Sequence, residues 1–333
     1  MTILVSGGAG FIGTNYVLNR LNKNDEKIVV FDKLTYAGNI KNFLSLVENK
    51  KFVFIEGDIL DKDKVKGVLK KYKPRAFINF AAESHVDNSI LKPEQFVLTN
   101  VLGTYCILEV IKSYYENLTL EKKDQFKFLN ISTDEVYGSL SLNEKPFTEN
   151  SNYMPNSPYS ASKAGADHLV RSFNSTFNIP VITTNCSNNY GPYQHHEKLL
   201  PLIINNAISW KKLPIYGNGE NIRDWIFVLD HCNAIDIILD KGKVGETYNI
   251  GADTEIKNIK IVTLICELLD SILPNHKGSY ASLITFVEDR LGHDKRYAIN
   301  CSKLRNDLGW RPKVSFKDGL VKTINWYLNN KNN

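Results

Sequence analysis

The chain has 333 residues, of which 43% are hydrophobic and 11% aromatic, so it is long enough to bury one large core or two cores of ordinary size. Its net charge of +5 comes mostly from lysines scattered among 36 acidic residues, which argues against a nucleic-acid partner. It has no leader-like amino end, no CxxC pair among five cysteines and no apolar run of about 18 residues. These features predict a cytoplasmic protein with free thiols and no membrane partner.

The first half of the chain alternates short apolar strands with helical segments, which is typical of a parallel sheet with helices on both faces. Expected strands cover residues 3–5, 28–31, 52–55, 76–80, 126–131 and 181–184. The carboxyl ends of such strands form a ligand crevice, and a polar or glycine-rich motif follows each one. Beyond about residue 190 the alternation weakens. We therefore expect a nucleotide-binding domain over 1–190 and mainly a smaller lobe over 191–333, with a helix at 259–273 and some segments returning to the main sheet.

The segment VSGGAGFIG places Gly7, Gly10 and Gly13 in a dinucleotide-binding spacing after the first strand. The glycines permit a tight turn, and the helix that follows directs its amino end at a pyrophosphate. Asp32 ends the second strand 19 residues after Gly13, where its carboxylate can bind an adenosine ribose and would repel a 2′-phosphate. These residues predict a Rossmann-type, doubly wound α/β domain that binds NAD in preference to NADP. Asp58, after the third strand, could hold the adenine amino group; an ordinary turn is the alternative for both aspartates.

Tyr159 and Lys163 are four residues apart just after Ser157-Pro158, a helix-start signal, so both project from one helix face. A neighbouring ammonium and a positive nicotinamide can favour the phenolate of a tyrosine, whose ordinary pKa is about 10. Thr133 can share a substrate hydroxyl with Tyr159. A surface lysine beside a packing tyrosine is the alternative for an isolated pair, but together with the dinucleotide motif the set predicts a hydride-transfer site.

The glycine turn, the Thr133 and Tyr159-x-x-x-Lys163 set, and NNYGP at 188–192 resemble the extended short-chain dehydrogenase/reductase family of nucleotide-sugar enzymes, over essentially the whole chain. Within that family, AAESHVD, STDEVYG, YSASKA, EKLLP, IRDW and DRLGHDKRYAI are most similar to the dTDP-glucose 4,6-dehydratases. The resemblance implies an NAD-dependent hydro-lyase acting on dTDP-glucose in deoxysugar biosynthesis, and a homodimer formed through helices in 93–116 and 159–178. His196 and Leu291 stand where the family usually has proline.

Dehydration of the sugar requires more than oxidation at C4, and the resemblance implies a role for each catalytic side chain. Tyr159 is expected to be the base for the C4 hydroxyl, Glu135 the base at C5, and Asp134 the acid at C6. Asp134 must then keep its proton well above about pH 4, which an enclosed site beside a second carboxylate favours. Strand-end caps are the alternative for both acids. A nucleotide-sugar 4-epimerase would not need them, and a regulatory NAD-binding protein would need only the glycine turn and Asp32.

The resemblance implies the remaining site residues by position. Along the cofactor we expect Gly7, Gly10, Phe11, Ile12, Gly13, Asp32, Lys33, Leu34, Thr35, Asp58, Ile59, Phe80, Ala81, Ala82, Ser84, Thr99, Tyr159, Lys163 and Asn189. Along the sugar nucleotide we expect Ser84, Thr133, Asn188, Lys198, Leu199, Pro214, Tyr216, Arg223, Asn258, Arg290 and His293. The two arginines suit a diphosphate because a guanidinium binds phosphate oxygens in a bidentate way. No His/Cys cluster has the spacing of a metal site, so no metal is expected.

Overall fold

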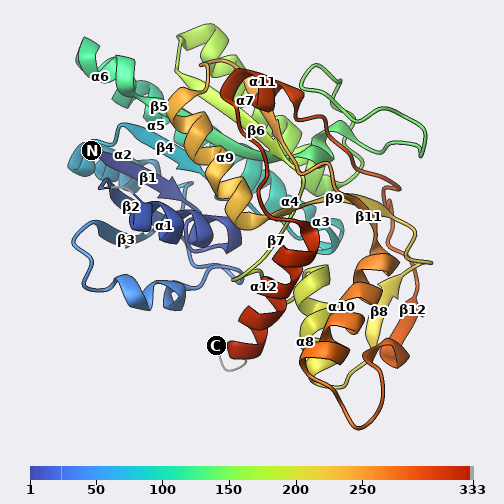
Figure 1. The fold of residues 1–333 in the computed structure, drawn as a ribbon. Coiled ribbons are helices and arrows are strands. Elements are labelled where there is room, and N and C mark those ends of the chain that lie inside the picture. The colour runs from blue at the N-terminus through green and yellow to red at the C-terminus, as the bar shows by residue number, and fades with distance from the viewer. Residues whose placement is uncertain (24, 331–333) are drawn as a thin grey trace.

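The computed structural model describes residues 1–23 and 25–330, which fold around a seven-stranded parallel sheet (Figure 1). In spatial order its strands are β10 (Thr247–Ile250), β6 (Val181–Cys186), β5 (Lys127–Thr133), β4 (Ala76–Asn79), β1 (Thr2–Ser6), β2 (Lys27–Asp32) and β3 (Phe52–Glu56). The chain runs outward from β1 to β3 and then returns to the other side of β1 at β4. Ligand crevices form beyond the carboxyl ends of the strands at such a reversal. The predicted doubly wound parallel sheet is confirmed.

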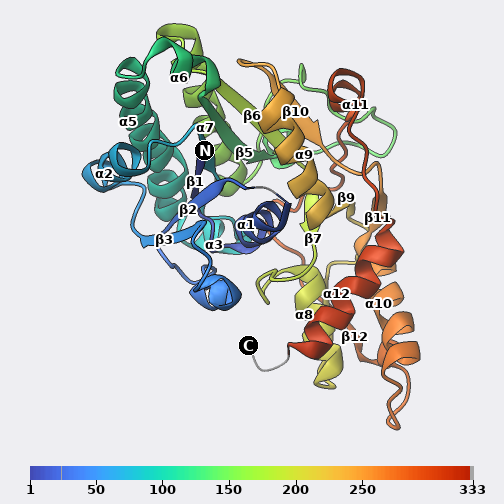
Figure 2. The ribbon, with the colours of Figure 1, turned by 60° about the vertical axis from the view of Figure 1, so that its left-hand side comes forward.

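Helices cover both faces of this sheet, as Figure 2 shows. On one face lie α1 (Phe11–Lys23) and α9 (Val228–Lys241), and on the other lie α2 (Lys62–Tyr72), α5 (Thr104–Glu116) and α7 (Pro158–Phe177). Successive side chains of a strand point to opposite faces. Accordingly, Ile3 and Val5 of β1 are fully buried in the core with α1 and α9, whereas Leu4 joins the core with α5 and α7. This burial on both sides explains the almost continuous apolar character of the strands.

Short helical segments connect these main elements. They are η1 (Ile40–Leu46), α3 (Val86–Leu91), α4 (Pro93–Phe96), η2 (Val97–Gly103), α6 (Leu120–Gln125) and η3 (Asp134–Tyr137). From α4 to α5 the chain is helical without a break, and this stretch is long and apolar enough, by length and composition, to cross a membrane. Half of its most apolar window is buried inside the protein, as in a core helix of the sheet layer.

The second half of the chain builds a lobe below the carboxyl edge of the sheet (Figure 1). Its helices are α8 (Leu199–Ile208), α10 (Asn258–Ile272) and α12 (Phe316–Asn329), with η4 (Tyr280–Leu283) before β12. Its strands form two small sheets, β11 (Glu255–Lys257) with β9 (Ile222–Phe227) and β7 (Asn188–Tyr190), and β12 (Ile284–Val287) with β8 (Leu213–Tyr216). Buried Ile203, Ile215, Ile265 and Leu320 belong to one core that joins the three helices to β8. After α9 the chain returns to the main sheet at β10, and α11 (Ser302–Leu308) packs against that strand.

Two strands of the main sheet extend further than the apolar pattern predicts. We expect β5 to end at residue 131 and β6 at 184, but they end at Thr133 and Cys186. Ser132 pairs with Asn185 and Thr133 with Cys186, so the ladder continues through polar residues that interrupt the apolar run. The extension carries the Thr133 side chain to the carboxyl edge of the sheet.

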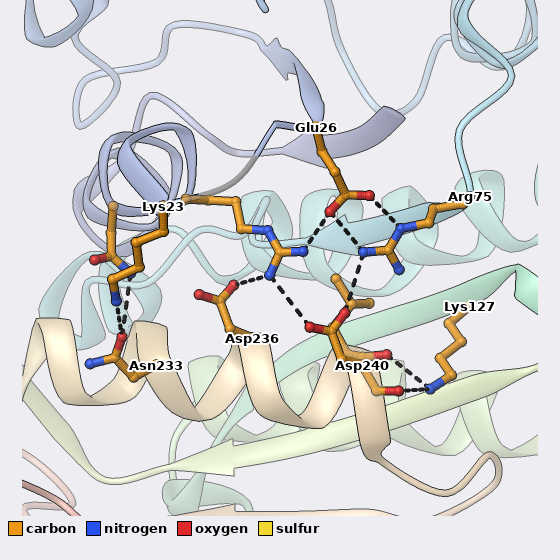
Figure 3. A network of polar contacts seen from close by, with 10 residues as sticks. Lys23, Glu26, Arg75, Lys127, Asn233, Asp236 and Asp240 are labelled. Atoms are coloured by element: carbon orange, nitrogen blue, oxygen red, sulfur yellow. Dashed lines mark hydrogen bonds and ion pairs between the residues drawn. The ribbon is translucent and has the colours of Figure 1, made fainter. Parts of the chain in front are cut away.

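A network of ion pairs fastens α9 to the amino-terminal half of the sheet (Figure 3). The Glu26 carboxylate accepts hydrogen bonds from Arg20 Nη2 and Arg75 Nε, each at 2.5 Å. Arg20 Nη1 also contacts Asp236 Oδ1 at 2.9 Å, and Arg75 Nη2 contacts Asp240 Oδ1 at 3.3 Å. The two arginines therefore connect Glu26, the residue directly before β2, to two acidic side chains of α9.

Replacing Glu26 should destabilise the fold in a pH-dependent way. Burial raises the pKa of Glu26, but hydrogen bonds from Arg75 and Arg20 outweigh it and lower the pKa to about 2. A lowered folded-state pKa stabilises the protein above the unfolded pKa of about 4.3, and this contribution is lost as the pH falls toward 2. Glu26→Gln should cost about 1.5–3 kcal/mol in urea unfolding at pH 7. The difference from the parent should shrink below pH 4.5, and the exposed control Glu48→Gln should show no such difference. Equal unfolding curves for Glu26→Gln and the parent at pH 7 would contradict this account.

Candidate active site

The turn between β1 and α1 leaves no room for a side chain at Gly7 or Gly13. Gly7 has a φ of +67°, and a Cβ there would lie 2.4 Å from Ala81 N. A Cβ on Gly13 would lie 2.4 Å from Gly7 O, so this glycine allows α1 to pack against the turn. The first turn of α1 contains no acidic residue that would occupy its positive end. The turn is therefore built for the close approach of an anionic group.

Two carboxylates lie at the ends of the next strands. Asp32 is buried and accepts hydrogen bonds from the backbone N–H groups of Ala9 and Leu34, both at 2.8 Å. Asp58 forms an ion pair with Lys33, with 2.7 Å between Nζ and Oδ2. Backbone donors thus fix the Asp32 carboxylate, which could accept hydrogen bonds from ribose hydroxyls.

A cavity of about 360 Å³ runs from the glycine turn to the end of β5. Every predicted cofactor residue except Leu34 lines it: Gly7, Gly10, Phe11, Ile12, Gly13, Asp32, Lys33, Thr35, Asp58, Ile59, Phe80, Ala81, Ala82, Ser84, Thr99, Tyr159, Lys163 and Asn189. The Leu34 side chain instead packs against the core with α1, and only its backbone serves the site, by its bond to Asp32. The cofactor role expected of Leu34 therefore stays a prediction, carried by its backbone.

The predicted catalytic acids lie at the inner end of this cavity. Thr133 caps the one-turn helix η3 by accepting a hydrogen bond from the Glu135 N–H at 3.3 Å, and this turn carries Asp134 and Glu135 into the cavity wall. Asp134 is 2% exposed, and its Oδ2 has no hydrogen-bond partner among the described residues. Buried polar atoms are rarely left unpaired in proteins, so this oxygen is available to a bound molecule.

The two neighbouring acids have different electrostatic surroundings. Burial, the Glu135 carboxylate and Asp224 raise the pKa of Asp134 well above its ordinary value, as the sequence predicted. Burial also raises the pKa of Glu135, but the positive charges of Lys198, Arg223 and Arg290 oppose that rise. The site therefore favours a protonated Asp134 beside a Glu135 that gives up its proton more readily.

Tyr159 and Lys163 face the same cavity from the start of α7. Ser157 and Ser160 form a reciprocal capping box, so the helix begins firmly at Pro158. Lys163 is 4% exposed, and its Nζ donates to the Ile131 carbonyl at 2.7 Å.

Burial pulls the ionisation of both groups in the direction of the neutral form. It raises the pKa of Tyr159 well above its ordinary value, with Glu135 and Cys186 adding to the rise, and it lowers the pKa of Lys163. A phenolate at Tyr159 therefore requires positive charge from Lys163 and from a bound cofactor, as the sequence suggested.

A second cavity, of about 240 Å³, lies between the sheet and the lobe. The predicted sugar-nucleotide residues that line it are Asn188, Lys198, Leu199, Pro214, Tyr216, Arg223, Asn258, Arg290 and His293. Ser84 and Thr133, the other two, line the first cavity. Glu135, Asn188 and Lys198 line both, so the two cavities meet at Glu135, next to Asp134 in the first cavity. Lys198 is held there by a hydrogen bond from its Nζ to the Ser84 carbonyl at 2.8 Å.

The two arginines of the second cavity differ in their partners. Arg223 is buried, donates to the carbonyls of Ile222 and Asp294 at 2.8 Å, and has no carboxylate within ion-pair distance among the described residues. Its guanidinium also lies over the Tyr297 ring, 4.2 Å from the centroid. A buried cation with this freedom suits an anionic ligand.

Arg290 already has a protein anion as its partner. Its Nε lies 2.5 Å from Asp87 Oδ1, and its guanidinium lies over the Tyr216 ring at 5.2 Å. The next residue, Leu291, is 77% exposed, and the His196 ring contacts the neighbouring His195 ring. Nothing in the structure explains these two replacements of the usual prolines.

Several lining residues were missed from the sequence. Glu197 lines both cavities and contacts two imidazoles, His195 at 3.6 Å and His85 at 3.9 Å. Asp87 and Tyr297 line the second cavity. Each belongs to a segment that carries the family resemblance, and that membership was the available signal. Within residues 1–23 and 25–330, no three His, Cys, Asp or Glu side chains form a group able to hold a metal ion.

Comparisons with known proteins agree over nearly the full length. Residues 4–323 match the family model described as GDP-mannose 4,6 dehydratase. The dTDP-glucose 4,6-dehydratase of Xanthomonas campestris pv. campestris strain B100 is 52% identical, covering 99% of this chain and 94% of that protein.

Solved structures place the chain in the same group. The crystal structure of dTDP-glucose 4,6-dehydratase from Bacillus anthracis, in complex with NAD, has a TM-score of 0.88 and 44% identity, covering 99% of this chain and 97% of the other. UDP-glucose 4-epimerase from Thermotoga maritima, with UDP-glucose, has a TM-score of 0.86 but 26% identity, covering 99% of each chain. The fold is thus shared with epimerases, whereas the sequence is much nearer to the dehydratases. From the first strand to the last helix, this chain belongs to the GDP-mannose 4,6 dehydratase family and, within it, to the dTDP-glucose 4,6-dehydratases.

Proposed function

We propose that this chain is an NAD-dependent hydro-lyase that converts dTDP-glucose into dTDP-4-keto-6-deoxyglucose, a step toward a deoxysugar. The observation that carries the proposal is the pair Asp134 and Glu135, which lines the first cavity together with Tyr159, while Glu135 also lines the second. Relatives named for this activity support it along the whole chain.

The first cavity fits NAD by its own geometry. The glycine turn would hold the pyrophosphate, Asp32 the adenosine ribose and Asp58 the adenine end, while Thr35, Thr99 and Asn189 would lie along the cofactor. The buried Asp32 carboxylate disfavours a 2′-phosphate. NAD, when bound, supplies the acceptor for the C4 hydride and returns that hydride to C6.

The second cavity would hold the sugar nucleotide. Arg223 and Arg290 would bind the diphosphate, with Arg290 exchanging or sharing its Asp87 partner. Lys198 and Asn188, at the junction, would direct the glucose toward the catalytic acids. In this proposal residues 1–190 bind NAD and residues 191–333 mainly bind the sugar nucleotide.

The side chains at the junction divide the chemistry. Tyr159 accepts the proton of the C4 hydroxyl as that carbon is oxidised, and Lys163 stabilises the negative charge that Tyr159 needs for this. The C4 ketone acidifies the C5 proton, which Glu135 removes. Asp134 donates its proton to the C6 hydroxyl, which leaves as water. The raised pKa of Asp134 keeps that proton available at neutral pH.

A 4-epimerase is the competing function, because known epimerases share the fold and such an enzyme would use the same cofactor and the same Tyr159 and Lys163 pair. It removes no proton from C5 and expels no water, so it has no use for two acids of unequal pKa at the reacting sugar. The asymmetry of Asp134 and Glu135 favours the dehydratase.

We also propose that the chain forms a homodimer in the cytoplasm. Val97 and Leu102 are 52% and 42% exposed on the helical stretch before α5, which packs against α7, and an apolar face of this kind suits a second copy. The five cysteines are buried and free, which suits a reducing compartment. Light scattering tests the assembly directly, since a monomer mass at micromolar concentration would contradict it.

Incubation with a panel of nucleotide-glucoses tests the activity and the choice of base. We expect the purified protein to remove one water from dTDP-glucose, with no net accumulation of reduced cofactor, and to turn over UDP- and CDP-glucose much more slowly. Mass spectrometry and NMR of the products give the readout. A galactose product, or no reaction with any member of the panel, would refute the proposal.

Substitution of the acid should separate elimination from oxidation. Asp134→Asn removes the proton donor at C6 but leaves Tyr159 and Lys163, so dehydration should fall by about 10²- to 10⁴-fold while slow oxidation at C4 persists. Tyr159→Phe should suppress both. Product formation and cofactor absorbance, followed in parallel, distinguish the two variants, and parent-like dehydration by Asp134→Asn would remove this residue from the mechanism.

A further inference from the structure

The ammonium of Lys163 is held in surroundings that disfavour its charge. The side chain is 4% exposed, and its one described hydrogen bond goes to the uncharged Ile131 carbonyl. Among the residues that the structure describes, no carboxylate lies within ion-pair distance of it. Burial accordingly lowers the pKa of Lys163. An anion that acts over a longer distance is what can offset this effect of burial.

Asp167 is that anion. It lies four residues after Lys163 on α7, so the two side chains share one face of the helix, and it is also 4% exposed. Among the groups around Lys163 that raise its pKa against the effect of burial, Asp167 has the largest effect. In a site from which water is excluded, the field of a carboxylate is weakly screened and reaches beyond direct contact.

Three hydrogen bonds keep the buried carboxylate of Asp167 ionised. Ser132 Oγ donates to Oδ2 at 2.6 Å, Asn130 Nδ2 to Oδ1 at 2.9 Å, and the Tyr153 hydroxyl to Oδ2 at 3.3 Å. Burial raises the pKa of Asp167 to about 6, while Lys163 and the three donors oppose the rise. The carboxylate is thus negative at neutral pH but close to the point at which it would take up a proton.

The donors themselves are held by a chain of side chains that crosses the sheet. Asn130 of β5 accepts a hydrogen bond from Asn79 of β4 at 3.2 Å, and Asn79 accepts one from Ser6 of β1 at 2.7 Å. On the other side, Asn185 of β6 donates to the Tyr153 hydroxyl at 3.1 Å. So extensive a set of buried, paired polar groups fixes the carboxylate in one position.

We propose that Asp167 is a positioning residue for the reaction: from beneath Lys163 it keeps that ammonium charged, and through it allows Tyr159 to accept the substrate proton. The inference rests on the proposed function for the role of Tyr159, but the charge coupling between Asp167 and Lys163 does not. Asp167 lines neither cavity, so it acts through Lys163 and not on the substrate.

The other ionisable groups near this pair cannot replace Asp167. Cys186 of β6 faces Lys163, but burial raises the pKa of its thiol to about 12, so it is neutral. Asp134 and Glu135 at the end of β5 face Tyr159 and raise the pKa of that hydroxyl, which opposes its role as a base. Of these groups, Asp167 is the carboxylate whose negative charge acts on Lys163.

The substitution Asp167→Asn preserves shape but removes the charge. Because Asp167 raises the pKa of Lys163, its loss should let the lysine release its proton at lower pH. The alkaline limb of the kcat profile with dTDP-glucose should therefore shift to lower pH by about 1 unit or more. The KM for dTDP-glucose should change little, since Asp167 lines neither cavity.

Tyr153→Phe should move the opposite limb. The Tyr153 hydroxyl lowers the pKa of Asp167, so its removal makes Asp167 take up a proton at higher pH. The acid limb of the kcat profile should then rise in pH, while the alkaline limb stays near its parent position because Asp167 is ionised there. This second variant retains the carboxylate, so it tests the coupling even if Asp167→Asn does not fold.

A direct titration of the lysine separates this inference from the proposed function. In protein labelled with ¹³Cε-lysine, the Lys163 resonance, assigned by its loss in Lys163→Arg, should titrate at lower pH in Asp167→Asn than in the parent. Asp230→Asn changes a buried aspartate of α9 that binds the backbone of Lys313 and Val314; it is the control and should leave the titration unchanged.

Identical Lys163 titrations in parent and Asp167→Asn, or kcat profiles that fall without a shift of either limb, would overturn the inference. A parent that does not dehydrate dTDP-glucose would instead refute the proposed function and leave the titration as the test of the coupling.

Discussion

The chemistry of this protein depends on burying ionisable groups of both signs at one place. Asp134 and Lys163 are almost completely removed from solvent, and Tyr159 is 9% exposed. Burial pushes each of them toward its neutral form. Which group keeps a charge is then decided by its few near neighbours, and these differ from one side of the site to the other.

Unequal neighbours assign the roles. Burial raises the pKa of Glu135, but Lys198, Arg223 and Arg290 oppose this rise, which makes Glu135 the better base. The negative charges of Glu135 and Asp224 add to the rise in the pKa of Asp134, which therefore keeps its proton more readily. In the proposed function, two adjacent carboxyl groups thus take the roles of acid and base by position, as in other enzymes that use a carboxyl pair. The positive groups come from the lobe, whereas the negative neighbours of Asp134 are Glu135, just after β5, and Asp224 of β9 in the lobe. The division therefore exists only when the lobe covers the carboxyl edge of the sheet.

The predicted site residues that are easiest to recognise from sequence, and that the structure brings to one cavity, belong to groups of neighbouring residues. The glycine turn is recognisable because its three glycines and the strand before them lie within a few residues of one another. Tyr159 and Lys163 are recognisable as a pair because a helix brings residues four apart to one face. Six of the seven strands of the main sheet were predicted from their apolar runs, whereas β10 was not assigned to it, and Ser132 and Thr133 extend β5 through polar residues. These two positions show that pairing with a neighbouring strand can override an apolar pattern.

What the sequence could not predict depends on contacts between distant segments. Asp87 and Arg290 are 203 residues apart, and only the packing of the lobe brings them into an ion pair. Asp167 reads from sequence as a polar position on an ordinary helix, although in the fold it is buried among donors from two other segments. Leu34 shows a related limit, since its place in the sequence does not reveal that its side chain packs in the core while its backbone N–H binds Asp32.

The central claim is that one site oxidises C4, eliminates water across C5 and C6, and returns the same hydride to C6. The most direct test uses dTDP-glucose with deuterium at C4 and follows the label by NMR. The account predicts deuterium at C6 of a 4-keto-6-deoxy product, with the C5 hydrogen exchanged for solvent through Glu135. Deuterium returned to C4, as in an epimerase, or released with reduced cofactor, as in a simple dehydrogenase, would contradict it.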